Sequence, residues 1–115
     1  MNEIKQLTDK ILKFRDARDW KQFHNSKDVA LSMVLEAAEL MEHFQWKTKE
    51  EAEAYALTHK KEIGEELADV AVWVFLLSHD LGIDIKKAIL NKIQKNKRKY
   101  PIKKARGKHT KYNKL

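Results

Sequence analysis

The sequence predicts an all-α fold, a bundle of four or five helices built around one core. Apolar residues recur at three- and four-residue spacing over several long stretches, as in amphipathic helices. The chain has only three Gly and one Pro, whereas β proteins usually need more turn-forming residues. Its 115 residues suit a single domain.

The first two helices are expected over residues 2–18 and 27–44. The apolar positions at helical spacing in the first are Ile4, Leu7, Ile11 and Phe14. Residues 19–26 break this pattern. Asn25 or Ser26 can then cap the second helix, because Asn and Ser accept hydrogen bonds from the first free backbone N–H groups.

Two helices are expected in the middle of the chain. A Thr-x-x-Glu capping pattern that begins at Thr48 predicts a short helix through about Leu57. A longer helix over residues 60–81 follows, either continuous with the first or after a break near Thr58. Beyond Asp69 this helix is apolar nearly all round, so we expect it to be central and buried.

The last predicted helix covers residues 85–99. Gly82 fits a helix stop before it, Asp84 can cap its N-terminus, and Pro101 ends it. The residues after Pro101 lack periodicity and are highly charged, which is typical of a flexible tail.

Charge is distributed unevenly along the chain. The first 85 residues contain 11 Lys or Arg and all 17 acids, a net charge of −6, whereas residues 86–115 carry +13. Such a basic segment could contact nucleic acid, a polyphosphate or a neighbouring subunit, or be a solvated helix face with a frayed end. We divide the chain into a helical domain, residues 1–101, and a basic flexible C-terminal tail, residues 102–115.

The absence of some features narrows the class of protein. There is no Cys, which excludes disulfides and Cys-ligated zinc and favours a reducing compartment, the cytoplasm. The charged N-terminus does not resemble a signal peptide. The longest apolar run, residues 70–77, has eight residues and is too short to cross a membrane.

Four acids stand out because they form two matched pairs within helices that should bury apolar surface. Glu36 and Glu39 form one pair and Glu66 and Asp69 the other, each spaced i, i+3 on one helix face. A solvated helix edge would explain the first pair alone, and a helix N-terminus would explain Glu66 alone. If all four converge, they cannot all remain ionised without a cation.

The ligand types indicate which cation. A carboxylate di-iron bundle needs Glu-x-x-His pairs, and zinc hydrolases use His-Glu-x-x-His; the sequence has neither pattern, and it has no Walker loop. Oxygen ligands alone indicate Mg²⁺, with Mn²⁺ as the alternative, and Mg²⁺ usually holds phosphates. We therefore expect a metal-dependent enzyme that acts on a nucleotide.

Four ordered sequence blocks carry a family resemblance that extends over about residues 14–101. The blocks are Arg18-Asp-Trp-Lys-Gln-Phe-His24, Leu35-Glu-Ala-Ala-Glu-Leu-Met-Glu-His-Phe-Gln-Trp46, Glu65-Glu-Leu-Ala-Asp-Val70 and Lys92-Ile-Gln-Lys-Asn-Lys-Arg-Lys-Tyr-Pro101. With these blocks the chain resembles the all-α nucleoside triphosphate pyrophosphohydrolases of the MazG-like group, most closely the dCTP pyrophosphatase branch.

The resemblance implies a helical homodimer or homotetramer that cleaves a (deoxy)nucleoside triphosphate, dCTP-like in this branch, to the monophosphate and pyrophosphate. It also implies that Glu36, Glu39, Glu66 and Asp69 are Mg²⁺ ligands. A carboxylate that is not saturated by metal could accept a proton from the attacking water, and we assign this role to Glu39.

Further residues match positions near the substrate in similar proteins. Trp20, His24 and Trp46 match positions at the base and sugar, although helix-end packing would explain the tryptophans and a loop role would explain the histidine. Trp73 stands where the dCTP-preferring branch often has Tyr, so the base preference stays open.

On the last helix, Lys92 and Asn96 match positions that contact the nucleotide, with a solvated basic helix face as the alternative. Tyr100, before Pro101, either helps to close the pocket or caps the bundle. The rival functions are a nucleic-acid-binding module that uses the basic C-terminal segment and a non-catalytic helical oligomerisation domain.

Overall fold

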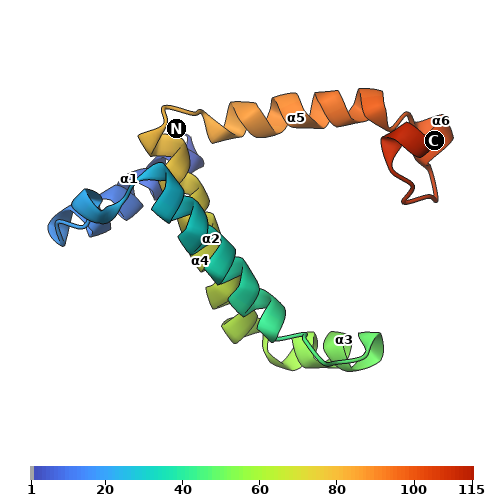
Figure 1. The fold of residues 1–115 in the computed structure, drawn as a ribbon, viewed down its shortest axis with the longest axis horizontal. Helices are drawn as coiled ribbons and strands as arrows, with labels where there is room; N and C mark the ends of the chain where they lie inside the picture. The colour runs from blue at the N-terminus through green and yellow to red at the C-terminus, as the bar shows by residue number, and fades with distance from the viewer. Residues whose placement is uncertain (1) are drawn as a thin grey trace. The chain divides into compact units, whose positions relative to one another are not determined.

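A computed structural model of the protein describes residues 2–115 and confirms the all-α prediction, with no strand among these residues (Figure 1). The α-helices are α1 (Glu3–Ala17), α2 (Ser26–Glu42), α3 (Lys49–Thr58), α4 (Lys60–Asp80), α5 (Ile85–Lys99) and α6 (Ile102–Ala105), and two 3₁₀ turns are η1 (Lys21–Phe23) and η2 (Tyr112–Lys114). Five helices lie within two residues of their predicted ends. The sixth, α6, has only four residues and was not expected.

The chain forms two compact units that meet between Gly82 and Ile83. The first contains α1 to α4, and the second contains α5, α6 and η2. The division that we expect from the sequence, into residues 1–101 and 102–115, stays a prediction.

The first unit is built around α4, which contacts α1, α2 and α3. Helices α2 and α4 lie side by side and run in opposite directions, with α3 at the end where α2 finishes and α4 begins (Figure 1). Because α2 and α4 are antiparallel, acids near the middle of one helix can face acids near the middle of the other.

The helix ends follow the capping residues found in the sequence. Asn25 caps α2 by accepting a hydrogen bond from the Asp28 N–H at 2.9 Å, and Thr48 opens α3 with a complete capping box. Asp84 accepts from the Lys87 N–H at 3.0 Å at the start of α5. Gly82 follows α4 with φ 68°, a left-handed conformation that costs glycine little.

The expectation that α4 is central is confirmed, because α4 contacts all three other helices of the first unit, whereas its burial beyond Asp69 is only partial. Only Leu76 and Ser78 of this helix are fully buried, although the stretch from Val72 to Leu77 is at least half-buried. The physical reason is that the three neighbouring helices cover only part of the α4 surface. Leu67, which precedes the stretch expected to be buried, is 52% exposed.

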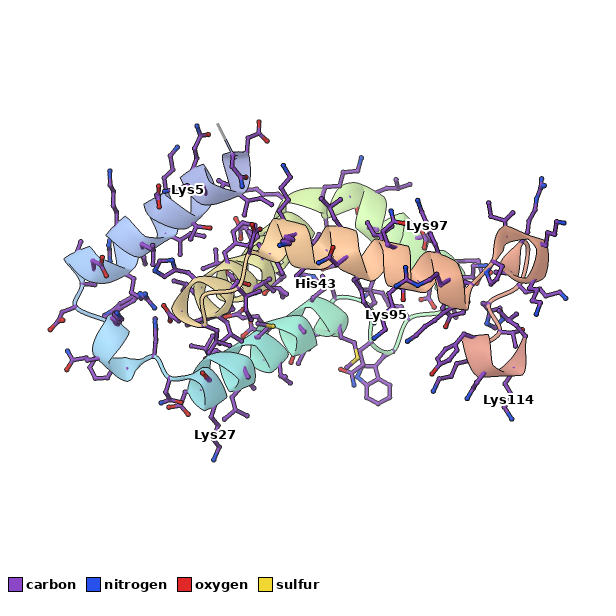
Figure 2. The ribbon with its side chains drawn as sticks, turned by 90° about the horizontal axis from the view of Figure 1, so that it is seen from above. Lys5, Lys27, His43, Lys95, Lys97 and Lys114 are labelled. Atoms are coloured by element: carbon purple, nitrogen blue, oxygen red, sulfur yellow. The ribbon has the colours of Figure 1, made fainter. Side chains whose placement is uncertain are left out.

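The second unit consists of the basic helix α5, followed by the short helix α6 and the 3₁₀ turn η2. The Tyr112 ring packs edge-on against Tyr100, with ring centroids 6.1 Å apart, and the Lys99 amine lies 4.6 Å from the Tyr112 centroid. Lysine side chains project outward from α5 and from the C-terminal segment, among them Lys95, Lys97 and Lys114 (Figure 2). No helix in the described part of the chain is long and apolar enough to cross a membrane.

Candidate metal centre and neighbouring pocket

Three carboxylates meet between α2 and α4. Glu36 and Glu39 project from α2 and Glu66 from α4, and each offers one oxygen that lies within 4.8 Å of the others. The i, i+3 spacing on α2 and the antiparallel pairing with α4 produce this convergence. Asp69, one turn further along α4, is exposed and lies outside this group of three.

The electrostatics of the cluster favour a cation. Burial raises the pKa of Glu36 to about 7, and the charges of Glu39, Asp69 and Glu66 add to the shift. Burial and the Glu39 carboxylate also raise the pKa of Glu66. Asp69 lies outside the group of three, but its charge acts on both buried acids.

One oxygen of Glu36 and one of Glu66 are buried and have no hydrogen-bond partner within residues 2–115. An unpaired buried carboxylate oxygen is costly unless a proton or a cation neutralises it. Converging hard oxygen donors of this kind are the ligands that Mg²⁺ and Mn²⁺ prefer. The residues present therefore fit a divalent cation.

A cavity of about 370 Å³ opens beside this cluster. Its lining consists of Glu39, Glu42, His43, Lys47, Tyr55 and Glu66. The His43 Nδ1 lies 2.7 Å from the Tyr55 hydroxyl, and the Lys47 amine donates to the His43 carbonyl at 2.7 Å. The same amine lies 4.4 Å from the Tyr55 ring centroid, so the three side chains hold one another in place.

His24 and Trp73 meet on the other side of the cluster. The imidazole contacts the Trp73 ring edge-on, with centroids 5.2 Å apart. Arg15 forms two hydrogen bonds to Asp80, at 2.8 and 2.9 Å, and its guanidinium lies 3.5 Å from the His24 Nδ1. Burial, and then the charge of Arg15, lower the pKa of His24, so this side chain is neutral near pH 7.

The other two tryptophans lie apart from this pair. Trp20 packs edge-on against Phe14, with centroids 5.7 Å apart. Trp46 is 92% exposed, and its φ of 70° is a conformation that bulky residues rarely adopt. The predicted base and sugar contacts of both side chains stay predictions.

The remaining predicted contacts belong to the second unit. Lys92 and Asn96 are exposed on α5, and Tyr100 caps its C-terminus, where it packs against Tyr112. Their contacts to a nucleotide stay predictions.

Sequence reasoning missed the residues that complete the pocket. His43 has one signal, because it stands four residues after Glu39 and therefore on the same helix face. Lys47 and Tyr55 have none, because the turn after α2 and the packing of α3 bring them there. The pairing of Arg15 with Asp80, 65 residues away, is equally a product of tertiary structure.

Known proteins resemble the chain in sequence and structure. It is 36% identical over 104 residues to dCTP pyrophosphatase 1 of Bos taurus and 36% identical to that of Homo sapiens, in each case over 89% of this chain. It spans 62% and 61% of the length of these relatives.

Among solved structures, a pyrophosphatase from Archaeoglobus fulgidus superposes with a TM-score of 0.84 at 36% identity, covering 88% of this chain and 94% of the other. Residues 31–115, which include all four predicted metal ligands, match the MazG-like family. These findings confirm the resemblance seen in the four sequence blocks, and we conclude that the chain belongs to the MazG-like family.

Proposed function

We propose that the protein hydrolyses a (deoxy)nucleoside triphosphate, dCTP-like in its base and sugar, to the monophosphate and pyrophosphate in a Mg²⁺-dependent reaction. The observation that carries the proposal is the convergence of Glu36, Glu39 and Glu66 with two buried, unpartnered oxygens. Family membership supports the reaction type, and the dCTP pyrophosphatases among the relatives support the substrate.

In the proposed mechanism Glu36, Glu39, Glu66 and Asp69 would hold the metal, for which Mn²⁺ would also serve. A bound divalent metal would lower the pKa of the attacking water and would screen the charge of the phosphates. Glu39, the exposed member of the cluster, accepts a proton from that water. Its exposure suits the role, because a solvated carboxylate can release the proton again.

The nucleoside is placed towards Trp73 and His24. Trp73 follows Asp69 by one turn of α4, a rise of about 6 Å, so the base and sugar would lie one turn from the metal. Aromatic faces stack on bases with little selectivity, and neutral His24 can form a hydrogen bond that selects among them. Trp20, Trp46, Lys92, Asn96 and Tyr100 are the further substrate contacts that we propose.

Self-association, as a homodimer or homotetramer, is part of the proposal. Five neighbouring positions form an exposed apolar stripe on α2, which is defined by Leu31, Val34, Leu35, Ala38 and Met41. A continuous apolar helix face left in water favours burial against a partner.

The test is pyrophosphate release with Mg²⁺ over a panel of canonical and modified nucleoside triphosphates. Substitutions Glu66→Gln and Asp69→Asn should each lower kcat/KM at least about a hundredfold, because metal ligation contributes several kcal/mol to the transition state. Glu39→Gln should lower kcat by a similar factor and leave Mn²⁺ affinity less affected.

Glu65→Gln is the matched control, because this exposed acid is adjacent to Glu66 and lies outside the cluster. It should retain activity. If no nucleotide yields pyrophosphate, or if Glu66→Gln behaves like Glu65→Gln, the proposed function is wrong.

Nucleic-acid binding is the second candidate, and the charge of +13 on residues 86–115 favours it. Binding to a phosphate backbone weakens steeply as salt rises. A titration of single-stranded DNA from low to high salt therefore tests this candidate separately from nucleotide hydrolysis.

A further inference from the structure

We propose that the cavity beside the acid cluster, with His43, Lys47 and Tyr55 in its wall, binds the β- and γ-phosphates of the substrate and then the pyrophosphate product. This inference rests on the proposed function and adds to it a phosphate subsite with named residues. Its volume of about 370 Å³ lies within the range of small-ligand sites.

The order of residues along the two helices supports the assignment. Going from the C-terminal towards the N-terminal end of α4, Trp73 comes before Glu66. Helix α2 runs antiparallel to α4 (Figure 1). In the same direction in space, Glu36 and Glu39 therefore come before His43 along α2. The acid cluster therefore lies between the aromatic pair at Trp73 and the cavity at His43.

Cleavage between the α- and β-phosphates matches this order. The water oxygen bonds to the α-phosphorus, the bond from that phosphorus to the α,β-bridging oxygen breaks, and that oxygen leaves on pyrophosphate, while one water proton passes to Glu39. With the nucleoside on the Trp73 side and the α-phosphate at the acids, the leaving group lies in the cavity.

Lys47 is held in the cavity wall and forms no ion pair within residues 2–115, although its charge acts on the exposed Glu51 carboxylate. Its amine donates to the His43 carbonyl at 2.7 Å and lies over the Tyr55 ring, which leaves two N–H donors for a ligand. Although Glu39, Glu42 and Glu66 line the same cavity, the ion pairs among residues 2–115 are Lys5–Asp9 and Arg15–Asp80.

A half-buried lysine whose ammonium group forms no ion pair fits an anionic ligand. Of the three acids in the wall, Glu39 and Glu66 belong to the proposed metal site, where a bound cation would offset their charge, and Glu42 is exposed to solvent. The His43–Tyr55 pair adds a polar contact: its two groups share one hydrogen bond of 2.7 Å and keep a further donor.

The experiment measures inhibition by each product separately. In Lys47→Met the apolar stem is kept and the charge is lost, so the inhibition constant of pyrophosphate should rise about tenfold or more, the effect of one charge-assisted hydrogen bond. The inhibition constant of the nucleoside monophosphate should change less than about twofold, because that product binds on the other side of the acids.

Lys47→Arg keeps the charge and should retain pyrophosphate affinity, which shows that a loss in Lys47→Met does not come from misfolding. Lys49→Met is the matched control: this exposed lysine is two residues away at the start of α3, and its substitution should change neither constant. Calorimetric titration of pyrophosphate in the presence of Mg²⁺ gives the same comparison without turnover.

Equal pyrophosphate affinity in wild type and Lys47→Met would overturn the inference, and so would an equal loss of affinity for both products. These outcomes leave the proposed function intact if wild type still releases pyrophosphate. Absence of turnover with every nucleotide would instead reject the proposed function.

Discussion

Glu36 shows how one residue can be unfavourable alone and useful in a site. Its carboxyl group is half-buried among three other acids, and burial is the main reason that its pKa rises to about 7. A group of this kind must take up a proton or bind a cation to be stable. At neutral pH a divalent ion is therefore expected to stabilise the fold as well as to serve the reaction.

The linkage between this pKa and stability gives a prediction about metal-free protein. Between pH 4.5, the ordinary pKa of a glutamate, and about 7, folded Glu36 holds a proton that the unfolded chain has released. Raising the pH through this window should therefore lower the free energy of unfolding. Saturating Mg²⁺ should raise the melting temperature by about 5 °C or more at pH 8 and by less at pH 5.

The measurement is thermal denaturation of EDTA-treated protein between about pH 5 and about pH 8, which compares the melting temperature with and without Mg²⁺. Glu36→Gln should weaken both the pH dependence and the response to metal, with the part due to the raised pKa of Glu66 remaining, whereas Glu65→Gln should keep both in full. A Mg²⁺ response of the same size at both ends of the pH range would contradict the account.

At the scale of helices, the salt bridge between Arg15 and Asp80 links α1 to α4. Two hydrogen bonds join the side chains, and the Arg15 side chain is only 3% exposed. Asp80→Asn should destabilise the protein by about 3 kcal/mol, because it leaves a buried guanidinium without its partner charge. Chemical denaturation measures this difference.

The exposed pair of Lys5 and Asp9 provides the control. Its side chains are 70% and 52% exposed, so Asp9→Asn should cost less than about 0.5 kcal/mol. The hydrogen bonds to Arg15 lower the pKa of Asp80 below its ordinary 3.8. The stability that this pair adds is therefore present above pH 3.8 and should be lost as the pH falls below that value. Equal effects of the two substitutions would contradict this role for Arg15.

Sequence predicts the elements of this fold better than their packing. Asn25, Thr48 and Asp84 cap helices through contacts within three residues, so local pattern is enough to locate the helix starts. The burial of α4 depends on how much of its surface the neighbouring helices cover, and the periodicity of the sequence does not predict this. An apolar position such as Leu67 can face a partner or solvent with the same local sequence.

The candidate site likewise contains residues that the local sequence predicts and residues that only the packing of the helices brings in. The i, i+3 spacing of Glu36 and Glu39 places both on one face, and the converging acid from α4 could be expected because it has a matching pair. Tyr55 reaches the cavity only through the packing of α3, and Lys47 through the turn that follows α2. Neither has a periodicity or a motif that would reveal it.

For the whole molecule, the apolar stripe on α2 leads to a prediction about assembly. We expect the protein to sediment as a multiple of its 13.6 kDa chain. Val34→Glu, at a position that is 64% exposed in the single chain, should shift this equilibrium towards the monomer, because a charge buried in an interface is strongly unfavourable.

Ala54→Glu on α3 is the control, since it adds the same charge at an exposed helical position outside the stripe. Sedimentation equilibrium of the three proteins at matched concentration distinguishes the outcomes. A wild-type protein that remains a monomer at all concentrations would contradict the assembly.

The most direct test of the central claim is diffraction from crystals that contain Mn²⁺ and a nucleotide with a non-hydrolysable α,β-bridge, recorded at the manganese absorption edge. The account predicts an anomalous peak between α2 and α4, coordinated by carboxylates of Glu36, Glu39, Glu66 and Asp69 and by an α-phosphate oxygen. A nucleotide bound elsewhere, or manganese absent from these carboxylates, would contradict it.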